Sequence, residues 1–187
     1  MTDAAEPLKK PNILIMLGEL ITSKTRLRLL IKFFVSQANK GYLNGLANEM
    51  GESTNAIRKE LNHLQGAGYL EKVKVDNKIE YKANIKHPMF EVLQKVVFKH
   101  LGLEDVVETV LERMGDLDQI ILVGNYAKGN DSGHIEVFLI GQGLNMEYIA
   151  QLENKIEDLI GRKVSFYLAS KFLLDREHIV LFNSKEK

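Results

Sequence analysis

Four side chains that can read bases or hold phosphates recur along one short stretch of the sequence. Asn55, Arg58, Lys59 and Asn62 are spaced three and four residues apart, which places them on one face of a helix. An arginine can donate two parallel hydrogen bonds to guanine, an asparagine can pair with adenine, and a lysine can neutralise a phosphate. We therefore interpret this face as a candidate for reading the major groove of double-stranded DNA.

The residues that flank this face extend the same chemistry. Ser53 caps the helix and Thr54 follows it, and both are small enough to let phosphate approach the helix start, where the dipole favours negative charge. Lys74 and Lys78 follow further along the chain and would contact phosphates. The candidate DNA-binding residues are Ser53, Thr54, Asn55, Arg58, Lys59, Asn62, Lys74 and Lys78.

Two further helices precede this one. Ser23 is expected to cap a helix whose apolar positions recur at helical spacing, and Gly51 forms the turn between a short helix over 43–50 and the helix that Ser53 begins. The residues expected to face inward are Leu27, Leu30, Ile31, Phe34, Leu46, Ala47, Met50, Ile57, Leu61 and Leu64. A short helix, a tight turn and a capped helix predict a helix-turn-helix.

A β-hairpin is expected directly after the helix-turn-helix. Residues 69–75 alternate, with Val73 and Val75 on one face and Lys72 and Lys74 on the other, and 76–78 carry turn residues. The strand that follows continues the alternation with Ile79 and Tyr81 as its apolar positions, and with Lys78 and Lys82 outside. A hairpin with a basic rim in this position is a wing.

Composition supports a protein with two modules. Residues 1–100 hold 16 Lys and Arg against 10 Asp and Glu, whereas residues 101–187 hold 9 against 15. The chain has no cysteine, so disulfides and thiolate metal sites are excluded. Its apolar runs are too short to span a membrane and its first residues lack the pattern of a signal peptide. We expect a cytoplasmic protein.

The N-terminal half resembles a known class of regulators. Residues 17–30 resemble the first helix of arsenic-repressor-like (ArsR-type) winged-helix transcriptional regulators, 50–64 their recognition helix and 66–70 the approach to their wing. The resemblance covers residues 13–88 and implies a DNA-binding regulator. The metal-sensing members use cysteines or histidine–acid clusters, so metal sensing is not carried over.

Helical spacing resumes after His87-Pro88 and predicts one broken helix, or two, over 87–115. The valines of this segment would either form the seam of a homodimer or pack on the second domain, and packing is the default. A dimer would match half-sites about 34–36 Å apart. His63, His87 and His100 lack the spacing of metal ligands and are interpreted as structural or exposed.

The C-terminal half predicts a small α/β domain. Strands are expected over 119–123, 134–141, 164–168 and 179–182, with a glycine-rich loop after the first. A helix capped by Asn145 would bury a stripe formed by Ile149, Leu152, Ile156 and Leu159.

Residues 117–183 resemble the minimal nucleotidyltransferase (DNA polymerase beta-like) superfamily. Gly124 and Gly129 match its two glycines, and Asn125 occupies the position of its serine. His134 and Glu136 occupy the positions of its two metal-binding aspartates, and 164–168 offer no third carboxylate. Because Mg²⁺ requires oxygen ligands, we predict a degenerate domain with no catalytic residues, no metal and no required cofactor.

Two interpretations of the loop remain open. It retains a nucleotide pocket formed by Gly124, Asn125, Lys128, Gly129 and Glu136, whose backbone N–H groups would meet phosphate, or it is an ordinary turn. Under the first interpretation, the ligand of the pocket would be a nucleotide or small-molecule effector.

The predicted fold class is α+β. Residues 13–86 form a winged helix-turn-helix domain, 87–115 a helical linker, and 116–184 a nucleotidyltransferase-like domain with a mixed sheet. The predicted function is a homodimeric transcriptional regulator that binds DNA and no membrane, and is not an enzyme. The alternatives are an active nucleotidyltransferase and an antitoxin-like module that binds another protein.

Overall fold

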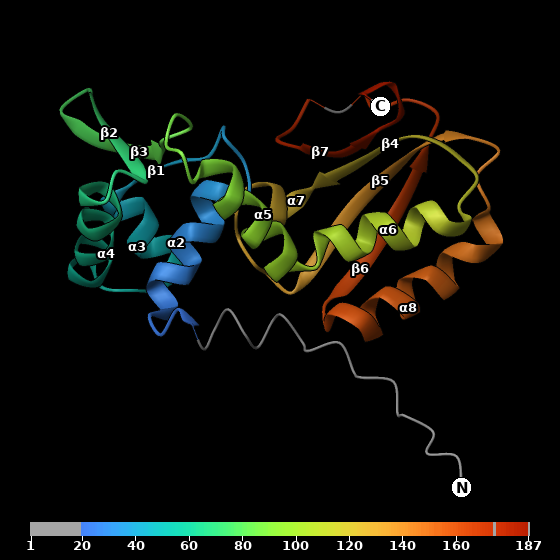
Figure 1. Cartoon of the computed structure of the whole chain (residues 1–187), viewed down its shortest axis with the longest axis horizontal. Helices are drawn as coiled ribbons and strands as arrows, with labels where there is room; N and C mark the ends of the chain where they lie inside the picture. Colours follow the sequence, from blue (N-terminus) through green and yellow to red (C-terminus); the bar gives the residue numbers. More distant parts are fainter. Residues whose placement is uncertain (1–19, 174, 187) are drawn as a thin grey trace, which may run out of the picture.

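The computed structural model describes residues 20–173 and 175–186. It shows a helical body with a hairpin and a second body built on a four-stranded sheet, joined by two consecutive helices (Figure 1). The start of the predicted first domain, residues 13–19, lies outside the described residues.

The three predicted N-terminal helices are confirmed. α2 (Lys24–Phe34) begins at Ser23, whose hydroxyl accepts a hydrogen bond from Arg26 N at 3.2 Å. α3 (Leu43–Met50) ends at Gly51, which has a φ of 62°. α4 (Thr54–Gly66) begins at Ser53, whose hydroxyl accepts from Ala56 N. All the residues predicted to face inward are buried except Leu27, which is partly buried against the core.

The wing is formed by two of the three strands of an antiparallel sheet. β1 (Lys40–Tyr42), β2 (Leu70–Val75) and β3 (Lys78–Ala83) are arranged in the order β1-β3-β2. The hairpin turns at Asp76 and Asn77, both of which have positive φ, the conformation of the two-residue turns that match strand twist.

The register of the hairpin corrects one expectation about its faces. Lys74 lies opposite Ile79, and Val75 lies opposite Lys78. Opposed residues of an antiparallel pair project to the same face, so basic and apolar side chains share both faces. Val73, Val75 and Ile79 are accordingly exposed.

The segment 87–115 forms two helices that belong to the core. α5 (Phe90–Leu101) ends at Gly102, which has a φ of 76°, and α6 (Leu103–Arg113) follows at once. A side chain at Gly102 would lie 2.6 Å from Cγ2 of Ile160. Val106 and Val110 are fully buried in the core that includes Ile160, as the packing alternative predicts, whereas Val92 is exposed.

The C-terminal sheet is mixed, as predicted. β4 (Asp116–Val123), β5 (His134–Gln142), β6 (Lys163–Ala169) and β7 (Ile179–Asn183) are arranged in the order β6-β5-β4-β7. β5 and β6 are parallel, and the other pairs are antiparallel.

Short helical segments and one long helix complete this half. α7 (Gly124–Ala127) lies between β4 and β5, and the 3-10 helices are η1 (Met146–Tyr148) and η2 (Ser184–Glu186). α8 (Ile149–Ile160) follows η1, which Asn145 caps. The predicted apolar stripe of α8 is wrong at its end, because Leu159 is exposed and Ile160 is buried instead.

The two halves share a continuous core. One cluster of buried apolar residues runs from Phe33 of α2 through Leu101 of α5 to Val164 of β6. The loop after α7 is seated on α2, where a side chain at Gly129 would lie 2.6 Å from Cα and O of Lys32. None of the described helices is both long and apolar enough to cross a membrane.

Candidate nucleic-acid interface

The exposed face of α4 carries all the base-reading side chains that the sequence singled out. Asn55, Arg58, Lys59 and Asn62 are exposed, whereas Ile57, on the opposite face, is fully buried. Asn55 Oδ1 accepts a hydrogen bond from Arg58 Nη1 at 3.2 Å. This bond holds the guanidinium along the helix face with its other N–H groups available.

A buried acid that no sequence pattern marked fixes α4 against α2. Glu60 is buried, and its carboxylate accepts from Arg26 Nε at 2.7 Å and from the Ser23 hydroxyl at 2.8 Å. Burial alone would raise the pKa of Glu60, but these two hydrogen bonds outweigh it and hold the pKa below its ordinary value. The ionised pair therefore positions the helix whose other face is exposed.

A cleft of about 700 Å³ separates α4 from the wing. Arg58 and Asn62 line it from α4, Lys72 and Lys78 line it from the hairpin, and Tyr42 lines it from β1. Side chains that are distant in sequence thus border one concave surface. Lys72 and Tyr42 were not among the predicted site residues, since only the sheet register and β1 place them here.

The cations of this surface have no acidic partner among the residues that the structure describes. In the part of the chain that the structure describes, no carboxylate forms an ion pair with Arg58, Lys59, Lys72, Lys74 or Lys78. Glu80 is instead held by Tyr42 and Lys40, and the hydrogen bond from Tyr42 is the main reason that its pKa is lowered. The exposed cations are therefore available to a negatively charged partner.

The structure separates the residues that the second resemblance grouped. Gly124 and Glu136 are together, because a side chain at Gly124 would collide with the Glu136 carboxylate. Asn125 and Lys128 are exposed, whereas Gly129 is buried against α2. The two glycines therefore lie in different surroundings, Gly124 against the Glu136 carboxylate and Gly129 against α2.

Neighbouring strands determine the surroundings of Glu136. His134 Nε2 lies 2.8 Å from Ser165 Oγ, and Ser165 is the β6 residue opposite Glu136. Phe138 continues this face and stacks on Tyr167 at 5.2 Å between ring centroids. The described residues include no group of three or more His, Asp or Glu side chains that could hold a metal ion.

Comparisons with known proteins give low similarity. No family model and no curated protein matches the sequence. Reduced HlyU from Vibrio cholerae N16961 is 15% identical, with a TM-score of 0.36 over 46% of this chain and 86% of HlyU. The AntR antimony-specific transcriptional repressor is 19% identical, with a TM-score of 0.37 over 57% of this chain and 98% of AntR. Identities and TM-scores this low assign the chain to no family.

Proposed function

We propose that this chain is a transcriptional regulator that binds double-stranded DNA with the surface formed by α4 and the wing. The observation that carries the proposal is the cleft between them, bordered by Arg58, Lys72 and Lys78 without acidic partners in the described structure. A helix fits the major groove, and unpaired cations beside it supply the contacts to phosphate.

The residues of this surface have different roles. Arg58 reads guanine through two hydrogen bonds, and Asn55 or Asn62 reads adenine. Lys59, Lys74 and Lys78 neutralise phosphates. Lys72 is proposed to do the same, because it lines the same cleft. Ser53 and Thr54 leave the start of α4 open to the DNA backbone.

Capture of random duplex DNA followed by sequencing tests this function. A regulator enriches one motif, and its affinity falls as salt concentration rises because bound phosphates release counterions. Capture without enrichment would exclude sequence-specific recognition, and binding that salt does not weaken would exclude the proposed contacts to phosphate. If the protein binds no DNA, it should be purified and examined for a protein partner. A stoichiometric partner is expected if the winged helix makes protein contacts or the chain is an antitoxin-like module.

The C-terminal half is proposed to be a nucleotidyltransferase-like domain without catalytic activity. Glu136 is the one carboxylate of the predicted pair, and His134 is engaged with Ser165. A single carboxylate is a poor substitute for the oxygen-rich site that Mg²⁺ requires.

Transfer of label from a nucleoside triphosphate, assayed with Mg²⁺ and with Mn²⁺, tests this assignment. No transfer is expected. Transfer that Glu136→Ala abolishes would identify an active nucleotidyltransferase instead.

We also propose that the chain binds DNA as a homodimer. Regulators with two-fold symmetry read two half-sites about 34–36 Å apart. Sedimentation should give twice the chain mass, and the enriched DNA motif should be palindromic. A monomer that selects a single, asymmetric site would contradict the dimer but not DNA binding.

A further inference from the structure

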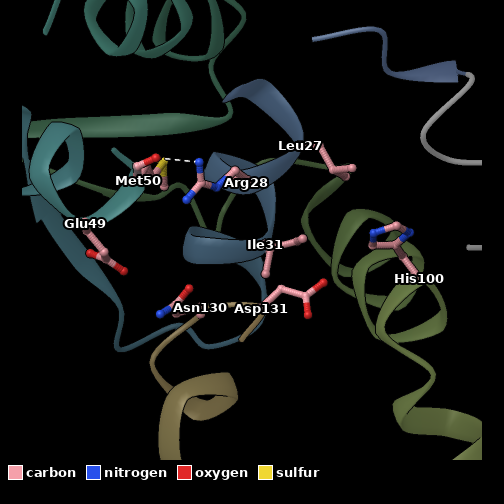
Figure 2. Close-up of a pocket in the computed structure, with 9 residues that line it drawn as sticks. Leu27, Arg28, Ile31, Glu49, Met50, His100, Asn130 and Asp131 are labelled. Atoms are coloured by element: carbon pink, nitrogen blue, oxygen red, sulfur yellow. Dashed lines mark hydrogen bonds between the residues drawn. The ribbon is translucent and has the colours of Figure 1, made fainter. Parts of the chain in front are cut away.

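A cavity of about 190 Å³ lies where the two halves of the chain meet. Figure 2 shows its lining, in which Arg28 projects from α2 and Glu49 and Met50 come from α3, whereas His100 comes from α5 and Asp131 from the loop after α7. One water needs about 10–15 Å³, so the cavity has room for a small molecule.

The two acids of the lining are already neutralised. Glu49 accepts from Lys32 Nζ at 3.0 Å. Asp131 accepts from Arg162 Nη2 at 2.7 Å and from the Tyr126 hydroxyl. Burial would raise the pKa of Asp131, but these hydrogen bonds outweigh it and lower the pKa. Neither acid therefore leaves uncompensated negative charge in the cavity.

Arg28, the arginine of the lining, has no acidic partner among the described residues. Arg28 donates from Nη1 to the carbonyl oxygen of Met50 at 2.6 Å, and no described carboxylate forms an ion pair with it. A guanidinium has five N–H donors in a fork that fits carboxylate and phosphate oxygens. The uncompensated charge of the cavity is therefore positive.

The opposite wall holds a polar atom without a partner. His100 is 6% exposed, and its Nδ1 has no hydrogen-bond partner among the described residues. Burial first, and the charge of Arg162 second, lower the pKa of this imidazole, so it is neutral near pH 7. Leaving a buried polar group unpaired is unfavourable, and a ligand with a hydrogen-bonding oxygen would relieve that cost.

We propose that this cavity is an effector site for a small oxyanion, held by the Arg28 guanidinium and by a hydrogen bond from Nδ1 of His100. A carboxylate and a phosphate share the required chemistry. The site joins α2 and α3 to α5 and the loop after α7, so its occupant contacts both halves of the chain.

The geometry also connects the cavity to α4. Met50 is the last residue of α3, and only the turn Gly51-Glu52-Ser53 separates it from the first residue of α4, Thr54. An oxyanion competes with the Met50 carbonyl for Arg28 and loosens the turn that orients α4. This coupling rests on the proposed DNA binding. We expect the bound anion to weaken the affinity for DNA.

Calorimetric titration of the full chain without DNA tests the site. Inorganic phosphate and succinate are used in separate arms, and saturable one-site binding in one arm identifies the class of oxyanion. Arg28→Gln should weaken that binding by about tenfold or more. Lys24→Gln, which removes an exposed charge of the same helix, should leave it unchanged, and ring NMR signals of His100 should shift on titration.

Two results would overturn the site. One is the absence of saturable binding in both arms. The other is equal binding by the wild type and by Arg28→Gln, since the anion would then bind elsewhere. If Arg28→Gln does not fold, Arg28→Lys replaces it, because lysine keeps the positive charge but lacks the fork of N–H donors. This variant should bind the anion more weakly than the wild type, and equal binding would overturn the site.

Affinity for the enriched duplex, with and without the saturating anion at constant ionic strength, tests the coupling. We expect the anion to lower the affinity of the wild type for DNA by about fivefold or more. In Arg28→Gln, the anion should leave the affinity for DNA unchanged. If the anion binds in the calorimetric titration but leaves the affinity for DNA unchanged, the coupling is refuted. A chain that binds no DNA would refute the proposed function, whereas the calorimetry would still decide the anion site.

Discussion

Individual side chains carry the proposed specificity, and Arg58 is the sharpest test of it. Arg58→Ala should lose about 1–3 kcal/mol on the preferred duplex and less on mismatched sequences, since a bidentate base contact discriminates by that amount. Fluorescence anisotropy with matched and mismatched duplexes measures both values. Lys95→Ala, an exposed charge on α5, is the control and should bind like wild type. An equal loss of affinity for all sequences would indicate that Arg58 contacts phosphates and does not read a base.

Lys78 should behave differently because it contacts phosphate. Lys78→Ala is expected to weaken all duplexes alike and to reduce the slope of log K against log salt by about 0.9. Anisotropy titrations at several salt concentrations measure this slope. A slope equal to that of the wild type would place the tip of the wing away from DNA.

Glu60 tests a stabilising contact beneath the DNA-binding face. Glu60→Gln should lower the free energy of unfolding by about 2 kcal/mol, since hydrogen bonds to a charged, buried group are lost. The lowered pKa of Glu60 means that its contribution is present above the ordinary glutamate range and is lost as pH falls through the folded-state value. Denaturant titration measures this, with Glu71→Gln as the control.

Glu71 is a suitable control because its ion pair is exposed on both sides. Its carboxylate lies 3.3 Å from Lys82 Nζ, and the two side chains are 40% and 39% exposed. Exposed pairs contribute about 0–1 kcal/mol. An equal loss in both variants would show that burial does not strengthen the contact of Glu60.

At the scale of elements, one glycine decides how the loop after α7 is seated on α2. Gly129→Ala should destabilise the protein by about 2–3 kcal/mol, because the new methyl group meets backbone atoms at 2.6 Å and φ is 76°. Denaturation midpoints measure the loss. Gly133→Ala has a similar φ of 79° with nothing within 4 Å, so it isolates the backbone strain. Equal losses in the two variants would show that the loop moves away without cost.

At the scale of the whole molecule, the buried histidine makes stability depend on pH. His100 has a lowered folded-state pKa, so the unfolded chain binds a proton first as pH falls below about 6.5. Stability should therefore fall with pH from there down to the folded-state pKa, below which this contribution is constant. Arg162 and Asp131 act on the imidazole from the other half of the chain, and Arg28 lines the same cavity.

Urea denaturation between pH 5 and 8 measures this dependence, and His100→Gln supplies the comparison. The variant should lack the decline that begins near pH 6.5. A decline of the same size in both proteins would assign the effect to other groups.

The sequence determined the features that depend on near neighbours. Helical spacing placed the buried stripe of α4, Ser23 and Ser53 marked helix starts, and Asp76-Asn77 marked the turn of the wing. Caps and two-residue turns are formed by residues a few positions apart, so local chemistry suffices to predict them. The same helical spacing identified the polar face of α4 that we propose binds DNA.

The tertiary structure alone decided what depends on distant partners. The register of β2 and β3 placed Ile79 beside Lys74, helix packing buried Ile160 in place of Leu159, and Gly129 met α2. The burial of His100 and the pairing of Glu60 with Arg26 likewise join segments far apart in the chain. Such contacts are selected by the packing of whole elements against one another, because the free energy of burial depends on which surfaces meet.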